Sequence, residues 1–182
     1  MAIDSGPPGG EHPGATPRAR VAAADAATIE SPGWTAGVTL MRNVKRRLFR
    51  HGMLLFLIGL LTGLVEEKFS NPRMGLSAHL EGILNGILLL ALGALWPELR
   101  LSPRTMTVAY WSTLCGTYGN WGVTTLAAIF ATGAMTPIAA QGLSAQPWQE
   151  NLITVGFISV GLAILSAAVL MLWGLRTADP ER

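Results

Sequence analysis

The sequence predicts an all-α fold, an integral membrane bundle of four helices. Half of the 182 residues are apolar and only 13% are charged, whereas a soluble domain carries about a quarter charged residues. Four apolar segments are long enough to cross the hydrocarbon core of a bilayer, for which a helix needs about 20 residues, with a range of about 17–25. Charged residues flank these segments and are nearly absent from them. With a single cysteine, the composition also excludes a disulfide-stapled module.

Residues 1–40 are expected to form a disordered tail, followed by a transmembrane domain over residues 41–182. The tail is rich in Gly, Pro and Ala and contains no apolar run. Such a segment cannot bury enough surface to offset the entropy of ordering it. It also lacks the basic start and apolar stretch of a secretory signal peptide.

The four expected helices comprise residues of about 49–65, 77–96, 105–132 and 151–174. All four contain glycine, which lets helices pack closely in a membrane. The first helix has almost no polar residue, the third is the longest and most polar, and the fourth looks like a packing scaffold.

The basic residues predict that both termini face the cytoplasm, in a multi-pass protein of the inner (plasma) membrane. Of the basic residues after residue 40, nine lie on the side of the termini and two on the other side, and loops rich in Lys and Arg stay in the cytoplasm. The basic charge is then a topology signal, so no nucleic-acid partner is expected. The nine are Arg42, Lys45, Arg46, Arg47, Arg50, Arg100, Arg104, Arg176 and Arg182, and the two are Lys68 and Arg73. Tryptophans near the helix ends fit aromatic belts at the membrane surfaces: Trp96, Trp111, Trp148 and Trp173.

Polar residues inside such helices are costly and indicate a functional site. The second helix contains His79, Glu81 and Asn85. Helical periodicity puts Glu81 and Asn85 on one face and His79 on another, an arrangement that suits a site between two copies of the chain. Alternatively, His79 and Glu81 sit at the headgroup boundary, and Asn85 makes an ordinary hydrogen bond between helices. The third helix adds Tyr110, Thr113, Cys115, Thr117, Tyr118, Asn120, Trp121 and Thr124.

The histidines limit which metal site is possible. His12 lies in the tail, and neither CxxC nor HExxH occurs. His51 and His79 begin helices on opposite sides of the membrane, so we expect them to be about 30 Å apart and unable to ligate one haem together. A single histidine can hold a haem with one open axial position. His51 fits a role in the basic anchor.

Three segments carry a resemblance to a known family. The run Asn71–Gly86 (NPRMGLSAHLEGILNG) resembles the membrane-bound hydroxylaminobenzene mutases, as do Gly116–Trp121 and Arg50–Gly52. The likeness covers roughly residues 45–175. It implies an isomerase that converts an aryl hydroxylamine to an ortho-aminophenol by moving a hydroxyl group from nitrogen to the ring.

A fainter resemblance extends to the styrene-oxide isomerases, which are four-helix membrane proteins. It implies a homotrimer that binds haem b at the subunit interface through a single histidine, here His79, with Asn85 lining the pocket. The acidic residue and the tyrosine of that group's third helix correspond to Gly116 and Thr124 in this chain. Glu81 is then expected to supply the missing acid, which favours the mutase over an epoxide isomerase.

Together these observations predict the roles of the site residues. His79 is the expected metal and haem ligand. Trp121 and Thr124 are expected to bind a small aromatic substrate, with Trp121 stacking on its ring. The residues expected to orient the departing oxygen and stabilise the developing cation are Glu81, Asn85, Tyr118 and Asn120. The alternatives are an epoxide isomerase and a small membrane transporter subunit.

Overall fold

The structure, a computed structural model, describes residues 32–176 and is all-α over that range. The predicted fold class is confirmed to that extent, with four main helices: α2 (Pro32–Gly63), α3 (Pro72–Leu95), α4 (Pro103–Phe130) and α6 (Pro147–Gly174). Short helical turns connect them: η1 (Glu66–Lys68), η2 (Trp96–Glu98) and α5 (Pro137–Ala140). Residues 1–31, most of the predicted tail, lie outside the described residues.

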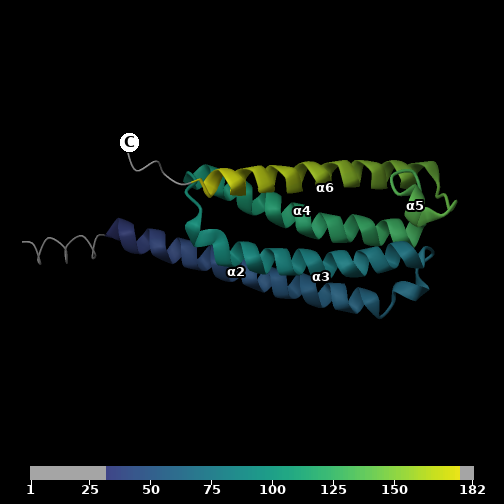
Figure 1. The fold of residues 1–182 in the computed structure, drawn as a ribbon, viewed down its shortest axis with the longest axis horizontal. Coiled ribbons are helices and arrows are strands. Elements are labelled where there is room, and N and C mark those ends of the chain that lie inside the picture. The colour runs from purple at the N-terminus through teal and green to yellow at the C-terminus, as the bar shows by residue number, and fades with distance from the viewer. Residues whose placement is uncertain (1–31, 177–182) are drawn as a thin grey trace, which may run out of the picture. The chain divides into compact units, whose positions relative to one another are not determined.

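The chain divides into two units, Met1–Leu40 and Met41–Arg182, and the second contains the site. In this second unit α3, α4, α6 and the later part of α2 lie side by side (Figure 1). One end of this unit has a core that packs Leu48 of α2 with Trp96 and Met171.

Proline and polar caps determine where the later helices begin. Asn71 accepts a hydrogen bond from the backbone N–H of Met74 and caps α3, and Ser102 caps α4 in the same way. Proline stands in the first turn of α3, α4 and α6, where its missing N–H costs nothing. Therefore α3 begins at Pro72 rather than at residue 77. His79 and Glu81 consequently lie about two turns inside the helix and not at its start.

Glycines bring the backbones of α2 and α3 into direct contact. A Cβ atom placed on Gly82 would lie 2.5 Å from the Cα of Gly59, and one on Gly86 would lie 2.7 Å from the backbone nitrogen of Phe56. No side chain larger than hydrogen fits at either crossing. The predicted use of small residues for close packing is confirmed here.

Two of the described helical segments are long and apolar enough to cross a membrane, Pro72–Glu98 and Pro147–Gly174. One of the four predicted belt tryptophans is placed differently from the prediction. Trp96 is 1% exposed and belongs to the core, because η2 turns its side chain inward. The other three are 58–60% exposed.

Candidate functional site

Glu81 lies between α3 and α4, where Thr124 holds its carboxyl group. The hydroxyl of Thr124, which is 1% exposed, donates a hydrogen bond to Oε2 of Glu81 over 3.2 Å. The side chain of Asn120 lies close to the same carboxyl group. Three of the predicted site residues are therefore brought together, and the partners of the carboxyl group are a neutral hydroxyl and a neutral amide.

Asn85 follows Glu81 by one turn of α3. It is buried, at 7% exposed, and shares the face of α3 that carries Glu81.

An apolar cavity of about 160 Å³ lies farther along the face of α3 that carries Glu81 and Asn85, toward the end of the helix. Leu88 and Leu92 line it, three and seven residues after Asn85. Thr117 also lines it, but its hydroxyl donates to the carbonyl oxygen of Thr113 over 2.8 Å. An apolar cavity of about 150 Å³ is large enough to bind benzene. The remaining lining residues are Thr113, Ile164, Ala167, Ala168 and Met171.

Sequence reasoning missed this cavity, although one signal was present. Leu88 and Leu92 continue the helical face that Glu81 and Asn85 define. The opposite wall depends on the small residues of α6, which only the tertiary structure brings to this position.

His79 faces α2, on the other side of α3 from the partners of Glu81. Its Nδ1 lies 2.8 Å from the carbonyl oxygen of Gly59. A carbonyl oxygen can only accept, so Nδ1 carries the hydrogen, and a neutral ring then keeps its lone pair on Nε2. The predicted placement of His79 and Glu81 on different faces is confirmed.

The position and hydrogen bond of His79 fit a haem that takes a single histidine ligand. Metal-bound histidines commonly donate their other ring N–H to a backbone carbonyl, as His79 does. Among residues 32–176, no group of three or more His, Cys, Asp and Glu side chains could hold a bare metal ion. A macrocycle that supplies the other ligands has no need of such a group.

The expected separation of about 30 Å between His51 and His79 is wrong. His79 contacts Gly59, eight residues after His51 on α2, which corresponds to about 12 Å of helix. The error arises because His79 packs against the last turn of α2, which ends at Gly63, and His51 lies only twelve residues before that end. The imidazole of His51 contacts Tyr118 on α4, whereas the imidazole of His79 contacts Gly59 on α2.

His51 contacts Tyr118 in addition to lying within the basic segment. Its Nδ1 is 3.2 Å from the Tyr118 hydroxyl oxygen, and that hydroxyl donates to the carbonyl oxygen of His51 over 3.2 Å. The two rings meet edge to face with centroids 5.7 Å apart. Tyr118 thus joins α4 to α2, six residues before Thr124.

Trp121 also joins α4 to α2. Its indole N–H donates to the hydroxyl of Thr62 over 3.1 Å, and its Cδ1 lies over Gly82, 3.1 Å from where a Cβ would stand. Thr62 is 6% exposed and was missed as a site residue, because a lone threonine in an apolar segment carries no distinguishing signal.

Comparison with known proteins places these residues in a family. Residues 44–176 match the model of the styrene oxide isomerase family. The chain belongs to this family. Hydroxylaminobenzene mutase HabB of Ectopseudomonas oleovorans is 49% identical over 138 residues, 75% of this chain and 84% of the relative. Hydroxylaminobenzene mutase HabA of the same organism is 40% identical over 129 residues, 70% of this chain and 96% of the relative. No solved structure matches the chain.

Both resemblances read from the sequence are confirmed by these matches. The region matched by the family model includes Glu81, Asn85, His79 and the α4 residues that bond to α2 and α3.

Proposed function

We propose that this protein is a membrane-bound mutase that isomerises an aryl hydroxylamine, such as hydroxylaminobenzene, to 2-aminophenol. The observation that carries this proposal is the 49% identity to a hydroxylaminobenzene mutase over most of both chains. The carboxyl group held by Thr124 and the benzene-sized apolar cavity farther along the same face of α3 support the same substrate.

The surface supports a membrane location. Large apolar side chains remain exposed along the helices, for example Leu84 and Leu162 at 63% and Leu172 at 72%. A soluble monomer rarely exposes a continuous apolar surface of this kind, whereas lipid covers it at no cost. We propose four membrane crossings with cytoplasmic termini in the inner (plasma) membrane.

The reaction needs a proton donor and no net oxidant or reductant. Protonation of the hydroxylamine oxygen lets the N–O bond break and leaves a nitrenium-like cation. The same oxygen then bonds to the ortho carbon and loses the added proton, and the ring proton at that carbon is transferred to nitrogen, so one proton enters and one leaves. Exclusion of bulk water keeps solvent from attacking another ring position.

The side chains of this protein can serve each requirement. Glu81 donates the proton and receives it back, with Thr124 and Asn120 orienting its carboxyl group. Asn85, one turn away, directs the N–O group, and the aromatic ring lies in the cavity beyond it. Tyr118 and Trp121 hold α4 against α2 through His51 and Thr62.

Haem b is the cofactor that we propose for His79, whose Nε2 has the required lone pair. When bound, its iron would supply Lewis acidity toward the hydroxylamine oxygen of a substrate held by a neighbouring copy of the chain, because His79 and Glu81 lie on different faces of α3. Because His79 faces α2 and Glu81 faces α4, separate variants test the two roles. A purified protein without a Soret band, together with full activity in His79→Ala, would overturn the haem assignment and leave the mutase intact.

The decisive experiment is to incubate the purified protein with hydroxylaminobenzene and measure 2-aminophenol by chromatography. In ¹⁸O-labelled water we expect unlabelled product, because the transfer is intramolecular. The family model also favours a second candidate, an epoxide isomerase. Turnover of styrene oxide to its aldehyde, without turnover of the hydroxylamine, would establish that candidate, and no turnover of either would favour a transporter.

We also propose a homo-oligomer, a trimer by resemblance to the styrene-oxide isomerases. Native mass spectrometry of the detergent-solubilised protein tests this directly. A monomer that retains full activity would contradict it.

A further inference from the structure

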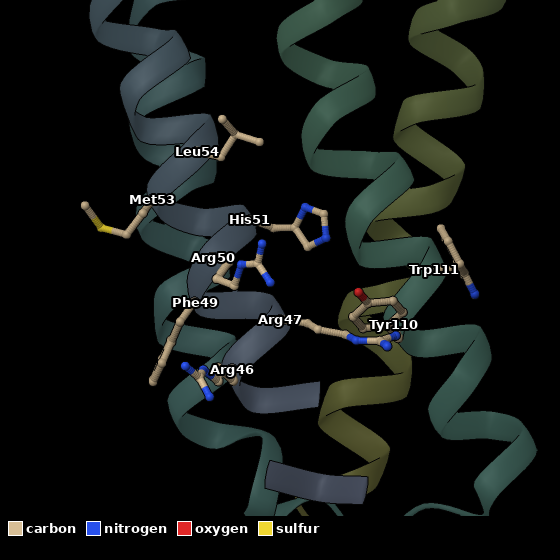
Figure 2. A pocket seen from close by; sticks show the side chains of 9 residues that line it. All are labelled: Arg46, Arg47, Phe49, Arg50, His51, Met53, Leu54, Tyr110 and Trp111. Carbon is tan, nitrogen blue, oxygen red and sulfur yellow. The ribbon is translucent and has the colours of Figure 1, made fainter. Parts of the chain in front are cut away.

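A second pocket, of about 800 Å³, opens between α2 and α4 (Figure 2). It lies apart from the Glu81 site, on the turns of α2 that follow residue 45 and on an early turn of α4. Figure 2 shows Arg47, Arg50 and His51 extending from α2 toward α4. The full lining consists of Arg46, Arg47, Phe49, Arg50, His51, Met53, Leu54, Tyr110 and Trp111.

The charged residues that line this pocket are all basic. Three of the nine lining residues are arginines and none is acidic. A guanidinium group presents a planar fork of N–H donors that matches phosphate and carboxylate oxygens in pairs. The chemistry therefore selects an anion with several oxygen atoms.

The same pocket has an apolar and aromatic side. Met53 and Leu54 are 56% and 48% exposed, and Trp111 is 59% exposed. An inorganic anion would leave these side chains uncovered. A ligand with an anionic head and a hydrocarbon tail would satisfy both parts of the pocket.

The pocket lies at the end of the helices where other basic residues gather. The backbone N–H of Arg100, just before α4, donates to the carbonyl oxygen of Gly174 at the end of α6. Arg104 and Arg176 follow in these same segments. In the orientation proposed above, this end faces the anionic cytoplasmic leaflet.

We propose that this pocket binds the phosphate headgroup of an acidic glycerophospholipid. The arginines of α2 hold the phosphate, Tyr110 and Trp111 flank the glycerol region, and an acyl chain runs along Met53 and Leu54. Basic pockets between transmembrane helices on the cytoplasmic side bind such headgroups in general. This site is separate from the proposed reaction and persists whatever the substrate is.

Native mass spectrometry of the full-length protein in detergent tests the proposal, with phosphatidylglycerol and phosphatidylcholine of identical acyl chains as probes. We expect phosphatidylglycerol to bind the unmodified protein at least about tenfold more tightly than it binds the triple variant Arg46→Gln/Arg47→Gln/Arg50→Gln. The matched control, Arg100→Gln/Arg104→Gln/Arg176→Gln, removes the same charge at the same end and should retain the affinity. Equal affinity for the two lipids, or equal losses in the two triple variants, would overturn the proposal.

Two further measurements distinguish paired contacts to phosphate from the effect of charge alone, and a lipid headgroup from free phosphate. The triple Arg→Lys variant of residues 46, 47 and 50 keeps the charge that directs membrane insertion, and a loss of several-fold is expected because lysine lacks the planar fork. Unchanged affinity in that variant would contradict paired contacts to phosphate. Inorganic phosphate at millimolar concentration should not displace the lipid, and displacement would show a site for free phosphate.

Discussion

The Nδ1 atom of His79 lies 2.8 Å from the carbonyl oxygen of Gly59 on the neighbouring helix. This contact fixes the tautomer of the imidazole and presses the ring against α2. It depends on the absence of a side chain at Gly63, where a Cβ would stand 2.5 Å from the same nitrogen. One glycine thus determines whether the imidazole can keep its position.

The first prediction concerns that glycine. Gly63→Ala should displace the imidazole, because its methyl group and Nδ1 cannot occupy the same space. Under the proposed haem assignment, the affinity for haem, measured by titration of the Soret absorbance, should fall about tenfold or more, as when the support of a metal ligand is removed.

Gly161→Ala is the matched control, because nothing lies within 4 Å of a Cβ at that position of α6. It should bind haem normally and melt at the same or a slightly higher temperature, since alanine favours a helix over glycine. Equal haem affinity in the two variants would contradict the role given to the Gly63 contact.

The second prediction concerns the carboxyl group that Thr124 holds. Glu81→Gln should lower kcat for 2-aminophenol formation by about 10²–10⁴, the usual contribution of a positioned proton donor. Thr124→Val should have a smaller effect, because it removes only the hydrogen bond that orients the carboxyl group. The rates are followed by chromatography with protein that elutes normally in size exclusion.

Glu98→Gln provides the control for loss of a carboxylate, since Glu98 is exposed in η2 and away from the site. It should retain full activity. A Glu81→Gln variant with normal kcat would exclude Glu81 as the acid.

The third prediction uses the cavity beyond Asn85. Ala168→Phe, at an exposed edge of the cavity, should fill it and raise KM for hydroxylaminobenzene about tenfold or more, with a smaller change in kcat. Ala94→Phe adds the same bulk at an exposed position of α3 that does not line the cavity, so its KM should be unchanged. Similar KM values in the two variants would place the aromatic ring elsewhere, and Trp121 would be the next candidate.

The fourth prediction concerns the segment between α4 and α6. The carboxylate of Glu150 accepts hydrogen bonds from the backbone N–H groups of Gly133, Ala134 and Ala145, at 2.9, 3.0 and 3.0 Å. Hydrogen bonds to a charged group are stronger than neutral ones. Glu150→Ala should therefore speed amide hydrogen exchange in residues 133–145 by about tenfold or more.

The exposed Gln141 is the control, because its replacement by alanine leaves these three bonds intact. Exchange in the rest of α4 and α6 should be unchanged in both variants. Equal exchange in Glu150→Ala and the unmodified protein would show that other contacts hold this segment.

The all-α fold class and the placement of Glu81 and His79 on different faces of α3 could be predicted from the local sequence. Residues four apart, such as Glu81 and Asn85, share a face of any helix, and His79 does not. The start of α3 was predicted five residues late because apolarity was given more weight than the cap at Asn71 and the proline after it. The partners of Tyr118 and Trp121 could not be predicted, because His51 and Thr62 are about sixty residues away in the chain.

The sequence by itself determined the all-α class, the resemblance to the mutases and the residues of α3 that carry ionisable groups. These depend on composition and on periodicity within one segment. The tertiary structure alone decided that Thr124 holds Glu81, that His79 packs against the last turn of α2, and that arginines line a pocket between α2 and α4. The physical reason is that each of these contacts depends on the axial offset between two packed helices. Close glycine contacts set that register, and no local pattern in the chain encodes it.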